Sequence, residues 1–441
     1  MGIQIRPLLI VATCLAFCAC ASTPSPQGAS GMAGGKARPL RSDPEASVAP
    51  STGERLTAEL SFISLAGFQH TDPVRIVEAV TGLMALMLPR QEIVWGPAVH
   101  HPWQESPVQI PTPSDALAFI CRDLDSGEFH VVFRGTNPVS PAEWLFQDFM
   151  VQKQVPWRQV QAGPAPEEAL VSEGTATAVC LRRDLCPASG AKGEGRSLAA
   201  ELIDILERSD GRCVMHFTGH SLGGLLASTM ALWLVDRLTS SGRDDLLGKL
   251  DVDVSSYAAP TAGNRPFAEY CASRVPEHAR YACDLDIVPR AWGEATLEDL
   301  PSLYMPDIGM QGITRSVFDF CLGLVREKGY VHSGALKGVP SRVVPVESGL
   351  YLLEAIYQHA IPYLDMLEPE RKETIIREVF KPIYGLVPVK GILPADVEGL
   401  FTADGSGNPP PGVRTDPRDG PGETEPSRRP GGTVPEGQTG H

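Results

Sequence analysis

The sequence has too little positive charge for a protein that binds nucleic acid. Its 441 residues include 38 Lys and Arg against 53 Asp and Glu, which gives a formal net charge of −15. Because no basic stripe is available to neutralise phosphates, we exclude a nucleic-acid partner. The same deficit argues against electrostatic docking on anionic lipid. Hydrophobic contact with an aggregated substrate remains compatible with this composition.

The N-terminal hydrophobic run is too short to span a bilayer comfortably. Leu8 to Ala19 has the length of a signal-peptide core and follows a short segment with one positive charge. A second apolar stretch, Val74 to Leu88, is interrupted by Arg75 and Glu78 and has the spacing of a packed helix. We therefore expect an exported protein without a second membrane span.

The end of the N-terminal run indicates the compartment. Phe17-Cys18-Ala19-Cys20 resembles the cleavage site of bacterial lipoproteins, in which a small residue precedes a Cys that is lipidated and becomes the new N-terminus. The resemblance implies a signal peptide over residues 1–19, lipidation of Cys20 and membrane attachment in the bacterial cell envelope, in the outer membrane or facing the periplasm. The alternatives are an ordinary secretory signal cut after an Ala, which would give a secreted protein, and an uncleaved anchor.

The cysteines lack a metal-binding arrangement. No Cys-x-x-Cys or Cys/His spacing suggests zinc, and we expect neither a metal nor an organic cofactor. Beyond the signal and Cys20, seven cysteines remain: Cys121, Cys180, Cys186, Cys213, Cys271, Cys283 and Cys321. In an oxidising compartment we expect disulfides in the near pairs Cys180/Cys186 and Cys271/Cys283, with at least one thiol left over. Buried free thiols are the alternative for Cys121, Cys213 and Cys321.

Much of the Pro and Gly lies at the two ends of the chain. Residues 20–54 and 401–441 contain too little bulky apolar side chain to fold, so we expect a disordered tether and a disordered tail. Between them, over residues 55–400, we expect a single catalytic domain. Its strand-like and helix-like segments alternate, which indicates an α/β fold with a mostly parallel central sheet covered by helices on both faces.

The hydrophobic pattern predicts individual elements of this domain. The expected strands are residues 116–121 and 130–133, which form a hairpin, and residues 213–218 and 251–257. The expected helices are residues 197–208, 222–238, 349–367 and 368–384.

Gly219-His220-Ser221-Leu222-Gly223 fits the Gly-x-Ser-x-Gly nucleophile elbow. It lies between an expected buried strand and a long helix, where the mechanism requires it. The glycines allow the tight turn that exposes the serine hydroxyl, and the helix N-terminus favours developing negative charge. Because adjacent side chains on such a turn diverge, we expect His220 to pack or orient rather than act as the base. Ser221 is the predicted nucleophile.

A nucleophilic serine needs a histidine to take its proton and a carboxylate to hold that histidine. In this fold the acid and then the histidine follow the serine along the chain. Asp286 lies in a loop after a strand-like segment, where the sites of α/β sheets gather, and Asp284 is its nearest competitor. Two histidines, His332 and His359, follow as candidate bases.

Four motifs in order resemble the class 3, or fungal-type, lipase family of the α/β-hydrolase superfamily. They are Phe133-Arg-Gly-Thr136, Val214 to Gly224, Tyr257 to Asn264 and Asp286-Ile-Val-Pro289. Trp144 and Asp148 also lie where the lid of the family often carries a Trp and an Asp. The resemblance covers about residues 110–290 well and extends more loosely to 365. It implies an α/β-hydrolase fold and the hydrolysis of lipid esters.

The resemblance also assigns the acid and the base. It implies that Asp286 is the acid and that His359, which is followed by a Tyr-Leu helix, is the catalytic histidine. His332 remains the alternative base, since it lies in an upstream element that often carries its own histidine. The chain departs from the family by extra sequence at about residues 292–329, just before these two histidines.

For the oxyanion hole, the resemblance implies the backbone N–H groups of Thr136 and Leu222, with the Thr136 hydroxyl as a third donor. Arg134 is expected to be a structural residue. Residues 137–149 are placed to be a lid over the acyl pocket, and an ordinary surface loop is the alternative.

Taken together, these features predict a serine-dependent carboxylic ester hydrolase that acts on lipid esters, as a triacylglycerol lipase does, through an acyl-enzyme. A phospholipase or a short-chain esterase of the same fold is the alternative enzyme. An alternative of another class is a non-catalytic envelope lipoprotein that uses the fold as a binding scaffold. The sequence does not fix the oligomeric state.

Overall fold

The computed structural model describes residues 50–100, 116–136, 150–344 and 351–381. All of these residues belong to one compact unit. The expected signal peptide, nearly all of the tether and the C-terminal tail lie outside the described residues.

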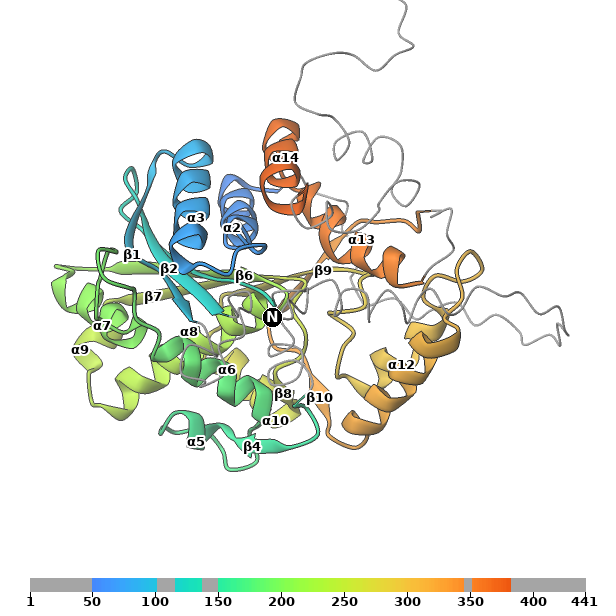
Figure 1. Ribbon diagram of the computed structural model, residues 1–441. Helices are drawn as coiled ribbons and strands as arrows, with labels where there is room; N and C mark the ends of the chain where they lie inside the picture. Colours follow the sequence, from blue (N-terminus) through green and yellow to red (C-terminus); the bar gives the residue numbers. More distant parts are fainter. Residues whose placement is uncertain (1–49, 101–115, 137–149, 345–350, 382–441) are drawn as a thin grey trace, which may run out of the picture. The chain divides into compact units, whose positions relative to one another are not determined.

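A seven-stranded sheet runs through this unit, in the order β1-β2-β3-β6-β7-β9-β11 (Figure 1). Its strands are β1 (Gln91–His100), β2 (Ala116–Asp123), β3 (Phe129–Phe133), β6 (Cys213–His220), β7 (Leu250–Tyr257), β9 (His278–Cys283) and β11 (Ala335–Val339). β2 pairs antiparallel with β1 and β3. From β3 to β11 each neighbouring pair is parallel, so β6, β7 and β9 all end at the same edge. The expected hairpin and the mostly parallel sheet are confirmed.

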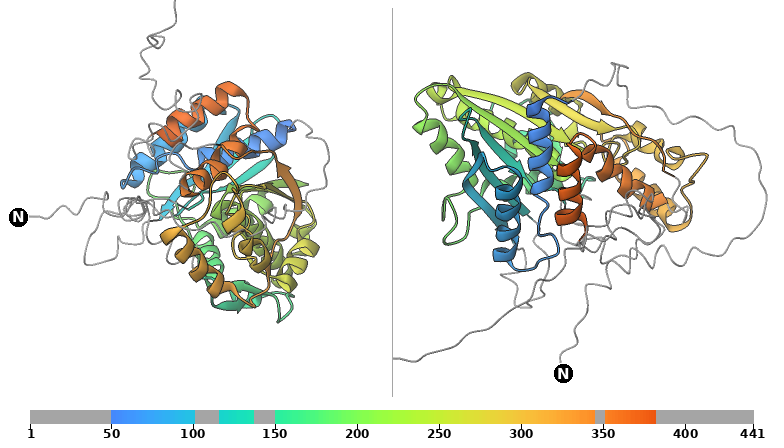
Figure 2. Two further views of the ribbon diagram at one scale, coloured as in Figure 1. Left: turned by 90° about the vertical axis from the view of Figure 1, so that its right-hand side faces the viewer. Right: turned by 90° about the horizontal axis from the view of Figure 1, so that it is seen from above.

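Helices cover both faces of this sheet, as Figures 1 and 2 show. On one face lie α2 (Thr52–Ile63), α3 (Pro73–Met87), α13 (Tyr351–Leu364), α14 (Pro369–Ile375) and the π-helical turn η3 (Ile376–Phe380). On the other lie α5 (Trp157–Val160), α6 (Glu173–Arg183), α7 (Leu198–Arg208), α8 (Leu222–Ser240), α9 (Asp244–Leu247) and α10 (Arg265–Arg274). This arrangement confirms the α/β fold, and the expected apolar segment at residues 74–88 is the packed helix α3.

The sheet strands divide their side chains between two cores. In β2, Leu117 and Phe119 join the core beneath α2 and α3, whereas Ala118 and Ile120 join the core around α8. This alternation follows from the two-residue period of a strand, since successive side chains point to opposite faces. Both faces of β2 are therefore buried.

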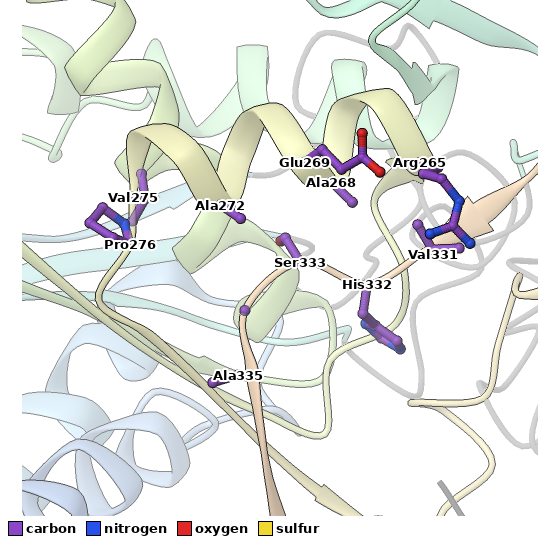
Figure 3. A pocket seen from close by; sticks show the side chains of 11 residues that line it. Arg265, Ala268, Glu269, Ala272, Val275, Pro276, Val331, His332, Ser333 and Ala335 are labelled. Atoms are coloured by element: carbon purple, nitrogen blue, oxygen red, sulfur yellow. The ribbon is translucent and has the colours of Figure 1, made fainter. Parts of the chain in front are cut away.

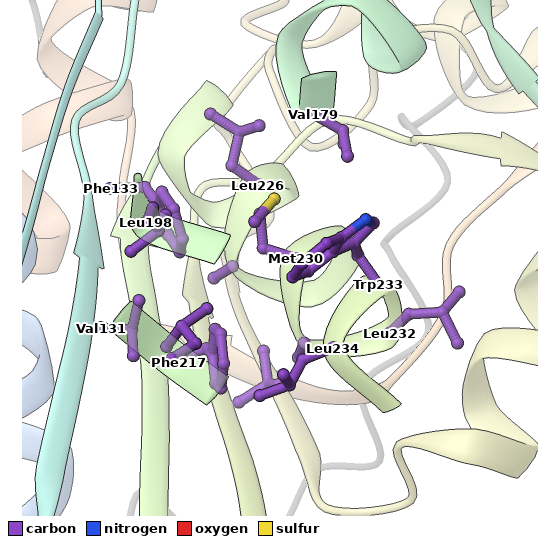
Figure 4. Packing of buried hydrophobic residues seen from close by; sticks show 14 of the residues in the cluster. Val131, Phe133, Val179, Leu198, Phe217, Leu226, Met230, Leu232, Trp233 and Leu234 are labelled. Carbon is purple, nitrogen blue, oxygen red and sulfur yellow. The ribbon is translucent and has the colours of Figure 1, made fainter. Parts of the chain in front are cut away.

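Figure 4 shows the core around α8. Phe133 of β3 and Phe217 of β6 are fully buried there, with Met230 and Trp233 of α8. Almost the whole length of α8 is buried, which explains why its sequence is apolar on every side. The helix that follows the nucleophile is thus held firmly against the sheet.

A smaller sheet and a helical insertion complete the described residues. The small sheet has the order β10-β8-β5-β4, formed by β4 (Gln154–Pro156), β5 (Leu170–Ser172), β8 (Gly263–Asn264) and β10 (Tyr330–Val331). The extra sequence at residues 292–329 forms α11 (Glu294–Glu298), the turn η2 (Leu300–Ser302) and α12 (Gly312–Val325). Seen from above, α12 lies toward the end of the large sheet away from β1 (Figure 2).

The catalytic domain begins slightly earlier than residue 55. Ser51 caps α2: its side chain accepts a hydrogen bond from the Glu54 backbone N–H, and the Glu54 carboxylate accepts one from the Ser51 N–H. This capping box satisfies two N–H groups at the helix start. Residues 52–54 are therefore helical rather than part of a tether.

The expected disulfides are absent, and that prediction is wrong. All seven cysteines in the described residues are unpaired. Cys271 belongs to the core around α8 whereas Cys283 belongs to the core beneath α2, so the two thiols lie on opposite faces of the sheet. Cys186 is exposed, beyond the end of α6, and its thiol donates a hydrogen bond to the Asp184 carbonyl, 3.4 Å away. Among the described helices, none has both the length and the hydrophobicity to cross a membrane.

Candidate active site

Ser221 occupies a strained turn between β6 and α8. Its backbone has φ 60° and ψ −129°, a conformation that residues other than Gly rarely adopt. The Ser221 N–H donates to the Tyr257 carbonyl oxygen at 2.8 Å, which ties the turn to the end of β7. Ser221 is partly exposed, whereas its neighbours on both sides are buried. The turn therefore presents this one hydroxyl at the edge of the sheet.

Two glycines make this turn possible. A Cβ on Gly219 would lie 2.4 Å from the backbone of Gly223, and one on Gly223 would lie 2.3 Å from the Phe133 carbonyl oxygen. Real Cβ atoms do not approach other atoms so closely, so neither position accepts a side chain. The Gly-x-Ser-x-Gly spacing thus reflects the contact between β6, the start of α8 and the end of β3.

The end of β3 touches the nucleophile turn. A Cβ on Gly135 would lie 2.5 Å from the His220 carbonyl oxygen and 3.2 Å from Ser221 Cβ. This contact brings Gly135, the residue before Thr136, against the turn that leads into Leu222, the first residue of α8. The Leu222 N–H has no acceptor within its own helix, because the first N–H groups of a helix lack partners. The two expected oxyanion donors therefore belong to adjoining segments.

Arg134 holds this strand end in place. Its side chain is fully buried, and its Nε donates to the Ser64 carbonyl oxygen at 2.6 Å. The guanidinium carbon also lies 5.0 Å from the centre of the Phe68 ring. Both partners lie after α2, so Arg134 connects the segment before Thr136 to the N-terminal helices. The structure places Arg134 as a structural residue.

Asp286 and His359 form a hydrogen-bonded pair. His359 Nδ1 lies 2.9 Å from Asp286 Oδ2 and 3.1 Å from Oδ1. Asp286 is fully buried, and its carboxylate also accepts bonds from the Val288 N–H at 2.9 Å and the Tyr363 hydroxyl at 2.8 Å. A carboxylate only accepts, so Nδ1 carries the proton and Nε2 of a neutral His359 is left with its lone pair. This is the tautomer that a general base requires.

His220 links this pair to the nucleophile turn. Its Nε2 lies 2.8 Å from the His359 carbonyl oxygen and must be the donor, since a carbonyl only accepts. The centres of the two imidazole rings are 4.6 Å apart. Burial, and then the neighbouring His359, lower the pKa of His220 well below its ordinary value, so this ring stays neutral. The residue before Ser221 therefore packs against His359, as the sequence predicted in outline.

His332 and Asp284, the competing candidates for base and acid, have other hydrogen-bond partners. His332 Nε2 donates to the Pro289 carbonyl oxygen at 2.6 Å, and burial lowers the pKa of His332 to about 3. The side chain of Asp284 is not bonded to a histidine, and its carbonyl oxygen accepts from Arg290. The structure thus joins Asp286 to His359 and leaves His332 and Asp284 apart from that pair.

Sequence reasoning missed the role of Tyr363. Its hydroxyl donates to Asp286 and accepts from the Cys283 backbone N–H at 2.9 Å, so it fixes the carboxylate from behind. Tyr363 follows His359 by four residues, and this spacing places both on one face of α13. That spacing is the signal that could have identified it.

Some predicted features lie outside the described residues. They are the expected lid at residues 137–149, with Trp144 and Asp148, and the lipidation site Cys20. Within the described part of the chain, no group of three or more His, Cys, Asp and Glu side chains is arranged to hold a metal ion.

Part of the chain matches a known family. Residues 130–295 match the family Lipase (class 3). The chain is similar to a crystal structure of M37 lipase, with 26% identity over 80% of this chain and 98% of that chain, and a TM-score of 0.63.

Two more distant likenesses are to fungal enzymes and carry no functional argument. The nonglycosylated LIP2 lipase of Yarrowia lipolytica is 16% identical over 66% of this chain and 79% of that chain, with a TM-score of 0.42. A Rhizomucor miehei lipase propeptide complex is 17% identical over 72% and 79%, with a TM-score of 0.38. The matched segment runs from β3 through the nucleophile elbow and Asp286. Over residues 130–295 the chain therefore matches the class 3 lipase family, and its fold is that of an α/β-hydrolase and its activity that of a serine carboxylic ester hydrolase.

Proposed function

We propose that this enzyme hydrolyses lipid esters, as a triacylglycerol lipase does, with Ser221 as nucleophile, His359 as base and Asp286 as acid. The observation that carries the proposal is the bond between the buried Asp286 and the partly exposed His359, which packs through His220 against the turn that exposes Ser221. No other histidine in the described residues combines a carboxylate bond at Nδ1 with contact to this turn.

The first half of the reaction acylates the enzyme. Ser221 Oγ attacks the ester carbonyl carbon while His359 Nε2 takes the hydroxyl proton, and Asp286 stabilises the resulting imidazolium. The carbonyl oxygen becomes an oxyanion, for which the Thr136 and Leu222 N–H groups are the proposed donors, aided by the field at the N-terminus of α8. When the carbon–oxygen bond to the alcohol breaks, His359 returns its proton to the leaving alkoxide.

The second half of the reaction releases the carboxylic acid product from Ser221. His359 removes a proton from water, whose oxygen attacks the acyl carbon, and Ser221 leaves with the proton that His359 donates back. Tyr363 and the Val288 N–H hold the Asp286 carboxylate in one orientation through both halves. The cycle needs only water as co-reactant.

The test compares Ser221→Ala with a matched serine change on the same helix, Ser241→Ala. Ser241 lies at the end of α8 and bonds only to a backbone carbonyl, so its loss should leave hydrolysis unchanged. Ser221→Ala should lower turnover of a p-nitrophenyl ester about 10⁴-fold or more, and should abolish labelling by a fluorophosphonate. A wild-type rate or label in pure Ser221→Ala protein rules out the assigned nucleophile. Absence of labelling in the folded wild type would favour the binding-scaffold alternative.

The substrate class within lipid esters follows from a second measurement. Rates across acyl lengths and head groups, above and below substrate aggregation, distinguish a triacylglycerol lipase from a phospholipase and a short-chain esterase. Activity on long-chain triacylglycerol emulsions supports the proposal. Activity confined to dissolved short-chain esters or to phospholipid contradicts it.

We also propose that the enzyme is a lipoprotein of the bacterial cell envelope, anchored through Cys20. The support is the Phe17-Cys18-Ala19-Cys20 pattern at the end of the N-terminal apolar run. In cells fed a labelled fatty acid, the wild-type chain should carry the label in the membrane fraction, and Cys20→Ala should lose it. An unlabelled wild-type protein in the medium would contradict the anchor and support an ordinary secretory signal.

A further inference from the structure

His332, the histidine that the catalytic pair does not use, lines a small internal cavity together with His278 and Arg280. The cavity lies between the β7 and β9 strands, α8 and α10, and has a volume of about 10 Å³. That is room for about one water-sized species. None of the described residues that line it is an Asp or a Glu.

Arg280 is buried without a counter-charge in this cavity. It is only 7% exposed, and its Nε and Nη1 have no hydrogen-bond partner among the described residues. A buried guanidinium normally forms an ion pair, because burial of an unpaired charge is strongly unfavourable. Burial lowers the pKa of Arg280 to about 10, still far above neutrality, so the side chain is charged. Arg280 therefore gives the lining of this cavity a fixed positive charge and two donor nitrogens without acceptors among the described residues.

Of the two histidines in the cavity lining, His278 contributes a further ring nitrogen without a partner among the described residues. His278 is 5% exposed, and its Nε2 bonds to Ser256 Oγ at 2.9 Å while its Nδ1 has no partner among the described residues. Burial first, and then the charge of Arg280, lower the pKa values of His278 to about 4 and of His332 to about 3. Asp253 raises the pKa of His278, and Tyr363 raises the pKa of Arg280, but both effects are smaller than that of burial. The cluster as it stands thus repels a second positive charge.

We propose that this cavity binds a monatomic anion such as chloride, held by Arg280 with His278 and His332 beside it. The anion supplies the counter-charge that the lining residues lack. A water molecule fits the same volume and accepts hydrogen bonds, but it leaves the buried charge of Arg280 uncompensated. An anion would also connect β9 to the segment around His332, whose Nε2 holds the Pro289 carbonyl in the loop after Asp286.

A second pocket adjoins the cavity. It has a volume of about 310 Å³ and shares Val331, His332 and Ser333 with the cavity. Figure 3 shows His332 and Ser333 on the segment that passes along α10, with Arg265 and Glu269 of that helix above them. The His332 segment therefore separates the cavity from the larger pocket.

The test measures thermal unfolding of the full chain in sodium chloride and in sodium gluconate at equal ionic strength. Gluconate is too large for the cavity, so chloride should raise Tm by about 3 °C in a saturable way. Arg280→Met should abolish this difference. Arg237→Met, which removes an exposed arginine on α8, should retain it.

Two results would overturn the proposal: equal Tm values in both salts for the wild type, or an undiminished difference in Arg280→Met. If Arg280→Met does not fold, bromide in wild-type crystals decides the question, because its anomalous scattering identifies it. A peak within hydrogen-bond distance of Arg280 supports the site, and a cavity that holds only water rules it out. Neither result depends on the assignment of Ser221.

Discussion

At the scale of single residues, the bond between Asp286 and His359 separates two histidines that the sequence left as alternatives. His359 Nδ1 is 2.9 Å from the carboxylate, whereas His332 is bonded to the Pro289 carbonyl. A base needs both an orienting carboxylate and a free Nε2. His332 uses its Nε2 in a bond to a backbone carbonyl, which favours His359 as the proposed base.

We therefore predict opposite outcomes for the two alanine variants. His359→Ala should lower kcat for ester hydrolysis about 10⁴-fold, because Ser221 loses its base. His332→Ala should keep kcat within about tenfold of the wild type, since it removes a bond in the loop after Asp286 and no proton acceptor. Steady-state kinetics on variants shown by circular dichroism to be folded provide the measurement. An inactive but folded His332→Ala with an active His359→Ala would reverse the assignment of the base.

The residues that the sequence identified and those that it missed differ in a physical way. Ser221 and Asp286 belong to short motifs whose spacing reflects local turns, so the printed sequence suffices to find them. Tyr363, which the sequence missed, bonds to Asp286 across 77 residues of chain. His220 was expected to pack or orient, but its partner His359, 139 residues away, was not identified. Such contacts exist only once α13 has packed beside β6 and β9.

At the scale of elements, the oxyanion site depends on how closely the end of β3 approaches the start of α8. Gly135, Gly219 and Gly223 remove the Cβ atoms that would separate these segments. Arg134 fixes the same strand end from the opposite side, through carbonyl groups after α2. The position of Thr136 is thus set by two elements besides its own strand.

We predict that Gly135→Ala impairs turnover more than stability. The new Cβ would meet the His220 carbonyl at 2.5 Å and Ser221 Cβ at 3.2 Å, so the strand end that leads to Thr136 must move away from the nucleophile turn. Loss of one oxyanion donor typically lowers kcat about 100- to 1,000-fold. The matched control is Gly211→Ala, where a Cβ meets nothing within 4 Å. Parallel measurements of kcat and Tm test this, and a Gly135→Ala enzyme with wild-type kcat would contradict it.

At the scale of the whole molecule, the predicted alternation of strands and helices was sufficient to give the fold class. The strands β2 and β3 have apolar runs that are almost wholly buried, and β6 and β7 are buried in their second halves. All four were expected to within two residues at each end. The short strands β8 and β10, of two residues each, carry no periodic signal and form only because their partners lie alongside. The predicted disulfide between Cys271 and Cys283 was wrong because proximity in sequence does not determine on which face of a sheet a side chain lies.

The first helix of the domain has a mechanical consequence. The Tyr257 hydroxyl donates to the Glu54 carbonyl oxygen at 2.8 Å, and the Tyr281 hydroxyl donates to the Glu54 carboxylate at 2.6 Å. Thr218, three residues before the nucleophile, donates to the Thr57 carbonyl oxygen at 3.0 Å. A pulling force on the chain before residue 50 is thus shared through α2 among β6, β7 and β9, so the strands that carry the nucleophile and lead to the acid move under load as one body.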